Sequence, residues 1–413
     1  MIVWDPIYGR FDTPSFLERL ILAPEVRRLR DVRLLNTPSP SLPTLSEIRR
    51  YSHTLGVLHL ALTNPHIGVQ KEELRALAAS ILIHDAATPP LAHLLEYYLR
   101  DRTGWDHESA LPQLLTGHHV IENVAHQILP GEELKFKRLC ASSGIDFEIV
   151  LQIVRKQHPI SVLLFGTLDF DNLDNVLRMA WALGLPTPAD PILMIAREIA
   201  CSLDGGLVLS AQLRGAVEQW ASVRQKVYEV LVYDELTVAS QAVLMKAMRL
   251  LFDQKQAIDI NWARRDGDII ELLSTAPETK ELMIRHFHEA LPRELVSIRL
   301  EGSLSDMGFP TRDHAVEFIE RFAREEFGVK KPFGYAFVDR GTFSKQLEFT
   351  DPTNRKKWTY GTSSRSVILY CFAQERSKGG AAKKEAFRRG ILKSLGVADS
   401  NVDDARKSAR FTG

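Results

Sequence analysis

An apolar run ends in a histidine and an aspartate at positions 84 and 85. The run from Leu77 to Ile83 contains one polar residue, and Pro89-Pro90 follow soon after the pair. A helix this apolar is buried on most sides, so an imidazole and a carboxylate at its end are costly unless they bind something. Imidazole nitrogens and carboxylate oxygens are common ligands of divalent metals. His84 and Asp85 are therefore candidate metal ligands on a helical scaffold.

Two other segments carry residues that could complete such a site. His53 shares a predicted helical face with the residues three, four and seven positions later, and these residues are apolar. The segment 169–178 is amphipathic, and Asp171 lies on its polar stripe. A His-Asp pair alone recurs by chance, but the same pair flanked by His53 and Asp171 in helical contexts is a more specific signal.

A third segment contains polar groups suited to proton transfer. His107 and Glu108 follow a predicted helix on which His93 and Glu96 are one turn apart. Histidine and glutamate are common general acids and bases. This segment indicates groups that support the metal ligands or move protons.

Six elements occur in an order and spacing that resemble a known family. The chain resembles the HD-domain metal-dependent phosphohydrolases, and within them the deoxynucleoside triphosphate triphosphohydrolase, or dGTPase-like, branch. A looser likeness continues to residues 224–228, so the resemblance covers the N-terminal and central parts of the chain. The six elements are Asp5-Pro6-Ile7-Tyr8-Gly9, Arg28-Leu29-Arg30, Arg50 to Val57, His84 to His93, His107-Glu108 and Asp169 to Asn175.

The resemblance implies a role for each matching residue. It implies one divalent metal ion, Fe, Mn or Zn with Mg as a further candidate, and hydrolysis by a metal-bound hydroxide while cations offset the phosphoryl charge. At position 96 the family usually has aspartate. The implied metal ligands are His53, His84, Asp85 and Asp171, the implied catalytic pair is His107 and Glu96, and Arg50 and His93 would bind substrate phosphate.

The chain departs from the family pattern at positions that contact substrate. Thr88 stands where a second histidine is usual, Asn172 where a lysine meets the terminal phosphates, and Asn175 where an aromatic residue is linked to reading the sugar. Together with Arg178, these residues are candidates for the pocket. Because the metal and phosphate residues match while the substrate-reading residues differ, we expect hydrolysis of a phosphate ester or anhydride of a nucleotide. A (deoxy)nucleoside triphosphate is one candidate substrate.

Two other functions are compatible with the same residues. The missing histidine at position 88 favours a catalytically weakened HD protein that acts as a nucleotide sensor or binds a partner. A basic stretch at 378–389 favours an HD nuclease acting on single-stranded nucleic acid, although such a stretch is more often a solvated helix. Metal content and phosphate release separate the sensor from the phosphohydrolase, and a labelled oligonucleotide tests the nuclease.

Composition argues against several classes of protein. Lys plus Arg and Asp plus Glu number 52 each, so a protein built mainly to coat nucleic acid is not favoured. The three cysteines have no CxxC spacing, which argues against a disulfide scaffold or a zinc knuckle. No apolar stretch approaches ~18 residues without a charge, and the N-terminus lacks a signal-peptide pattern. We therefore expect no membrane association and a cytoplasmic location.

The 413 residues are enough for two domains, or for one domain with an appendage. Helical periodicity dominates the first half, whereas alternation at 296–300, 334–338 and 366–372 predicts strands. The family resemblance also implies a homo-oligomer, a dimer or higher. We expect a mainly α fold with an HD phosphohydrolase core at 1–210, a helical extension at 211–290 that packs on the core or a partner subunit, and an α+β C-terminal region with a basic tail at 291–413.

Overall fold

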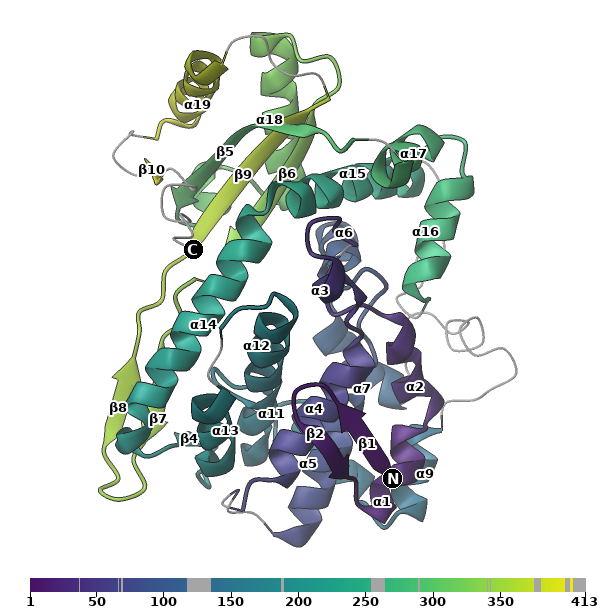
Figure 1. Cartoon of the computed structure of the whole chain (residues 1–413), viewed down its shortest axis with the longest axis vertical. Coiled ribbons are helices and arrows are strands. Elements are labelled where there is room, and N and C mark those ends of the chain that lie inside the picture. The colour runs from purple at the N-terminus through teal and green to yellow at the C-terminus, as the bar shows by residue number, and fades with distance from the viewer. Residues whose placement is uncertain are drawn as a thin grey trace.

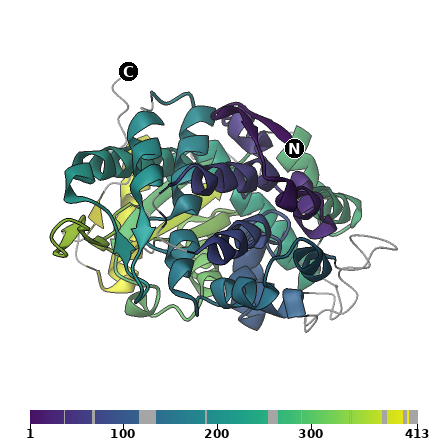
Figure 2. The ribbon, with the colours of Figure 1, turned by 90° about the horizontal axis from the view of Figure 1, so that it is seen from below.

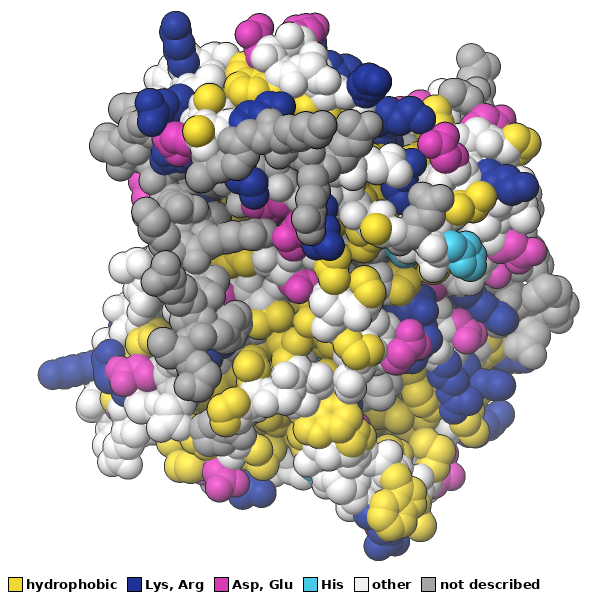
Figure 3. Space-filling model, turned by 45° about the horizontal axis from the view of Figure 1, so that its top comes forward, with side chains coloured by type: hydrophobic (Ala, Val, Ile, Leu, Met, Phe, Trp, Pro, Cys, Tyr) yellow, Lys and Arg dark blue, Asp and Glu magenta, His cyan; other side chains and the backbone are white. Residues whose placement is uncertain are grey.

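The computed structural model is mainly helical and has three small sheets, which confirms the expected fold class (Figure 1). Among the described residues, no helix is long and apolar enough to cross a membrane. Acidic and basic side chains both occur on the face drawn in Figure 3, with hydrophobic side chains between them. The structure describes residues 1–36, 38–65, 67, 70–116, 135–186, 189–253, 264–288, 290–339, 341, 343–374, 380–397 and 402–403.

The N-terminal part is a bundle of helices around one apolar core (Figure 2). At its centre α4 (Arg50–Leu62) packs against α5 (Lys71–Ile83) and α12 (Phe170–Ala182). Every residue of α5 from position 76 onward is buried, as its apolar run predicts. The other helices here are α1 (Ser15–Ile21), α2 (Pro24–Arg27), α3 (Pro43–Glu47), α6 (His93–Thr103), α7 (His107–Thr116), α9 (Phe136–Ser142), α10 (Phe147–Val154), α11 (Val162–Phe165) and α13 (Ala189–Glu198).

The central helices pack on this bundle and on the C-terminal sheet. The long helix α14 (Arg214–Tyr233) lies along α12 and α13, and α15 (Glu235–Phe252) continues to α6 and the sheet (Figure 1). Helices α16 (Asp266–Thr275) and α17 (Lys280–His288) complete this part. Helix α14 contributes buried residues to the N-terminal core, and α15 contributes buried residues to the apolar cluster under the C-terminal sheet.

The C-terminal part is an antiparallel sheet in the order β10-β5-β9-β6. Successive side chains of β9 alternate between two apolar clusters, so both faces of this strand are buried. One face packs on α15 and α6, and the other on α18 (Arg312–Phe327) and α19 (Gly380–Leu395). The three strands expected from alternation are confirmed as β5 (Arg293–Glu301), β6 (Phe333–Asp339) and β9 (Ser366–Ala373). The strand β10 (Val402–Asp403) pairs with β5.

Of the two remaining sheets of the described residues, one is local and one joins distant parts of the chain. Strands β1 (Ile2–Asp5) and β2 (Gly9–Asp12) form an N-terminal hairpin. In the second sheet β4 pairs in parallel with β7, so residues 347–360 return to the N-terminal core, although the sequence division places them in a separate region. Such distant pairing has no local signal. The strands of this sheet are β3 (Ala200–Cys201), β4 (Leu207–Val208), β7 (Leu347–Thr350) and β8 (Lys357–Tyr360).

Candidate metal centre and its pocket

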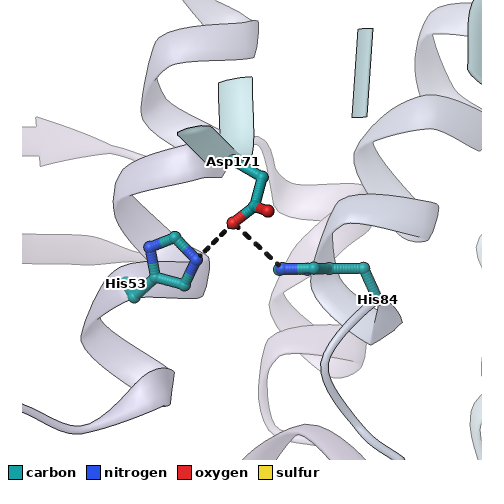
Figure 4. Close-up of side chains that lie close together, drawn as sticks. All are labelled: His53, His84 and Asp171. Atoms are coloured by element: carbon teal, nitrogen blue, oxygen red, sulfur yellow. Dashed lines mark hydrogen bonds and ion pairs between the residues drawn. The ribbon is translucent and has the colours of Figure 1, made fainter. Parts of the chain in front are cut away.

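Three of the predicted metal ligands come from different helices and point toward one another (Figure 4). His53 lies on α4, His84 follows the last residue of α5, and Asp171 is in the first turn of α12. Asp171 Oδ1 lies 2.8 Å from His53 Nε2 and 3.8 Å from His84 Nε2. The structure therefore brings together side chains that are far apart in sequence, with His53 and Asp171 separated by 118 positions.

Asp85 completes the group from beside His84. The Nδ1 atom of His84 lies 2.7 Å from the backbone carbonyl of Ile81, which turns Nε2 toward Asp85 Oδ2 at 3.5 Å. Asp85 Oδ1 accepts from Arg50 Nη1 at 2.8 Å and from Thr88 Oγ1 at 2.9 Å. By contrast, His84 Nε2 and Asp85 Oδ2 are buried without a hydrogen-bond partner among the described residues. Such orphaned atoms are rare and costly, and a divalent cation is the partner that fits both.

A buried network holds His53 from behind. His53 Nδ1 lies 2.7 Å from Asp174 Oδ2, and this aspartate also accepts from Tyr8 Oη at 2.8 Å. Arg178 donates from Nε to Asp174 at 2.9 Å and from Nη1 to Asp5 at 3.0 Å. An acceptor on one ring nitrogen fixes the orientation of a ligating histidine. The N-terminal hairpin therefore helps to orient His53 toward the candidate metal position.

The protonation of the centre favours a cation. Burial by itself lowers the pKa of His53, but its hydrogen bonds to Asp171 and Asp174 outweigh this effect and raise the pKa to about 9. Burial by itself raises the pKa of Asp85, but Arg50 and the nearby imidazoles hold it well below its usual range. Both aspartates that face the site, Asp85 and Asp171, have lowered pKa values. A metal ligated by His53 would take the place of the proton on this ring.

A second group of polar side chains lies at the start of α6 and α7. The two carboxylate oxygens of Glu96 serve two histidines, because Oε2 lies 2.7 Å from His93 Nδ1 and Oε1 lies 3.1 Å from His107 Nδ1. Arg100 also donates to this carboxylate. Burial by itself lowers the pKa of His107, but the neighbouring Glu96 raises it above the usual value. The predicted pair of His107 and Glu96 is thus in contact, with His93 beside it.

One cavity of about 370 Å³ connects the two groups. It is the size of a site for one small molecule. Among the predicted residues, those that line it are Arg50, His53, His84, Asp85, His93, His107, Asp171 and Asn175.

Four other predicted residues do not line the cavity. Glu96 is buried beneath the two histidines that it contacts. Thr88 is fully buried and holds Asp85, and Arg178 belongs to the network behind His53. Asp169 caps the start of α12 by accepting from the backbone N–H and the side-chain amide of Asn172. Three of the four pocket candidates therefore do not line the cavity, and Asn175 does.

The comparisons with known proteins agree with this geometry. No protein-family model matches the chain. The chain is 22% identical over 209 residues to a Dictyostelium discoideum protein named deoxynucleoside triphosphate triphosphohydrolase SAMHD1 homolog, covering 46% of this chain and 38% of that protein. It is 25% identical over 137 residues to SAMHD1 of Gallus gallus, covering 30% of this chain and 22% of that protein. The resemblance to HD-domain phosphohydrolases is confirmed. The chain spans less than half the length of these relatives.

Two solved structures share the fold over nearly the whole chain. A hypothetical protein from Aquifex aeolicus has a TM-score of 0.66 at 16% identity, covering 95% of this chain and 99% of that chain. A phosphohydrolase from Bacteroides thetaiotaomicron has a TM-score of 0.63 at 15% identity, covering 91% of this chain and 100% of that chain. The C-terminal region, which the sequence resemblance left out, is therefore part of a shared architecture.

Thr88 has a structural role that differs from that of the histidine usual in HD-domain enzymes. Its hydroxyl donates to Asp85 Oδ1, so it holds the carboxylate with Oδ2 turned toward His84. We expect Thr88→Val to weaken metal affinity by about 10- to 100-fold, as the loss of a group that orients a ligand typically does. Thr88→Ser keeps the hydroxyl and should stay within a few-fold of wild type. Metal titration of chelator-treated protein measures this, and equal affinities for Val and wild type would contradict it.

Several residues of the site were missed by the sequence analysis. Asp174 had a usable signal, because it lies on the same polar stripe as Asp171, one turn later. The aromatic part of the cavity had none, since its residues come from distant elements. This part includes Tyr97, Tyr228, Tyr335, Phe337 and Tyr370.

Proposed function

We propose that the chain is a metal-dependent hydrolase of a phosphate ester or anhydride of a nucleotide, with (deoxy)nucleoside triphosphates among the candidate substrates. The observation that carries the proposal is that His84 Nε2 and Asp85 Oδ2 are buried without a hydrogen-bond partner among the described residues, in a cavity that Asp171, His93 and His107 also line. The named relatives support the phosphohydrolase class.

Each polar group of the cavity has a task in this reaction. A divalent cation held by His53, His84, Asp85 and Asp171 would supply Lewis-acid polarisation of a phosphoryl oxygen and activation of water. Arg50 lines the cavity and uses one nitrogen on Asp85, so its other N–H groups can bind phosphoryl oxygens.

Proton transfer is assigned to the second polar group. Glu96 raises the pKa of His107 and so favours the protonated imidazole, the form that can donate a proton to the leaving oxygen. Glu96 orients His107 and His93 together and offsets the positive charge of a protonated ring. His93 lines the cavity and would contact the phosphate.

A phosphate-release screen tests the proposal. Purified protein, reconstituted with Fe, Mn, Zn or Mg, would be offered nucleoside mono-, di- and triphosphates with ribose or deoxyribose. We expect metal-dependent release of phosphate or polyphosphate from at least one class. If the metal binds and no nucleotide is cleaved, the sensor function replaces this proposal.

His107 should matter for rate and not for metal content. We expect His107→Ala to reduce phosphate release by ~10²–10⁴-fold, the usual contribution of a general acid or base. Because His107 lies in the second group, the bound metal should stay at the wild-type level. His314 on α18 is exposed, and His314→Ala is the matched control. Wild-type turnover in His107→Ala would remove the proton-transfer role.

Homo-oligomerisation stays a prediction from the family resemblance. Light scattering at micromolar concentration should show at least a dimer. A monomer under these conditions would contradict this part of the proposal.

A further inference from the structure

The cavity has an aromatic end that the proposed chemistry does not use. Tyr97 on α6, Tyr228 on α14 and Phe337 on β6 are half-buried and line it. The rings of His93 and Tyr97 stack with their centroids 6.2 Å apart. The aromatic end therefore adjoins the His93–Glu96–His107 group, and part of it is supplied by the C-terminal sheet.

A glutamine in this end is held in one orientation. Gln241 on α15 lines the cavity, and its Oε1 accepts from Tyr335 Oη at 2.6 Å. Tyr335 is buried, and burial raises the pKa of its phenol, so the hydroxyl keeps its proton and needs an acceptor. The amide oxygen of Gln241 is that acceptor. The Nε2 group has no acceptor among the described residues, and this leaves an N–H donor for a ligand in the cavity.

We propose that Gln241, oriented by Tyr335, donates to an acceptor on the edge of an aromatic heterocycle, and that the aromatic side chains of Tyr228 and Phe337 contact this ring. This inference rests on the proposed function and adds that the site recognises the heterocyclic ring of the substrate. Stacking on aromatic side chains tolerates any ring, whereas a buried amide discriminates by hydrogen bonding. The C-terminal region is then part of the active site and sets the selectivity for the leaving group.

Nucleosides without phosphate test this inference separately from hydrolysis. Binding of adenosine, guanosine, cytidine, uridine and ribose 5-phosphate to the full chain would be measured by calorimetry. The test variant is Gln241→Leu with Tyr335→Phe, because the double change leaves no buried hydroxyl without a partner. The control is Gln225→Leu, a change of an exposed glutamine on α14.

We expect at least one nucleoside to bind the wild-type protein. The double variant should bind it about tenfold more weakly, the effect of one lost hydrogen bond to a buried group. Ribose 5-phosphate binding should stay within twofold, and the control should match wild type throughout. Circular dichroism would confirm that the double variant is folded. If it is not folded, Tyr335→Phe alone is the test variant. This change removes only the group that orients the Gln241 amide, so nucleoside affinity should fall by a smaller factor.

Three results would overturn the inference. One is a wild-type protein that binds no nucleoside. Another is a double variant that binds every nucleoside as tightly as wild type does. A double variant whose affinity for ribose 5-phosphate falls as much as its affinity for nucleosides would overturn it as well. Failure of the proposed function has a different signature, since a protein that binds nucleosides through Gln241 and releases no phosphate keeps the ring site and loses only the hydrolase assignment.

Discussion

Replacing Asp85 with alanine is expected to remove the bound metal and to abolish measurable phosphate release. The change deletes one of the four proposed ligands and leaves Arg50 buried opposite the vacated position, where its charge would repel a cation. Because a metal contributes several kcal/mol to transition-state stabilisation, turnover should fall by at least ~10³-fold. Elemental analysis and a phosphate-release assay measure the two effects on one sample.

The matched control is Asp190→Ala, a change of an exposed aspartate on α13. It should keep wild-type metal and activity. If Asp85→Ala retained one metal per chain, Asp85 would not be a ligand. If it lost the metal but kept its activity, the hydrolysis would not depend on this centre.

The second large effect is expected from Gly56→Ala, a change that adds one methyl group. A Cβ atom at Gly56 would lie 1.9 Å from Asp174 Oδ1 and 2.4 Å from Arg178 Nη2, much closer than atoms can approach. Both neighbours are buried and paired with each other, so the methyl group must break this ion pair or displace α12 from α4. We expect the free energy of unfolding to fall by about 3–5 kcal/mol, the usual cost of breaking a buried pair. Since Asp174 orients His53, metal affinity should fall as well.

Chemical denaturation with the metal-free protein isolates the effect on stability. Gly215→Ala is the control, because Gly215 lies on α14 with no atom near its would-be Cβ. Alanine should be neutral or stabilising there by up to about 1 kcal/mol, in line with helix propensity. Equal stability of Gly56→Ala and wild type would mean that α4 and α12 are not packed as described.

The clustering of His53, His84 and Asp171 could be predicted because the signals of these residues are local. The run before His84 is apolar except for Ser80, which marks a buried helix, and the polar pair at its end differs from its surroundings. His53 and Asp171 likewise lie on helical stripes of defined polarity. The order of the motifs then indicated which segments, far apart in sequence, belong to one site. In the structure His53, His84 and Asp171 lie close to one another.

The rest depends on contacts that no local pattern encodes. Strand β4 pairs with β7 at one position, between residues that are far apart in sequence. Residues 347–360 could therefore not be assigned to the N-terminal core from the sequence. The orientation of Gln241 depends on Tyr335, which is 94 positions away. Thr88 could be recognised as a departure, but only the structure shows that its hydroxyl holds Asp85 and that it does not reach the cavity.

Anomalous X-ray diffraction at the absorption edge of the bound metal tests the central claim most directly. Crystals of reconstituted protein should show one peak per chain, with His53 Nε2, His84 Nε2 and oxygens of Asp85 and Asp171 within about 2.0–2.3 Å, typical of transition-metal ligation. No peak at this position in the reconstituted protein, or a peak only between His93, Glu96 and His107, would contradict the assignment.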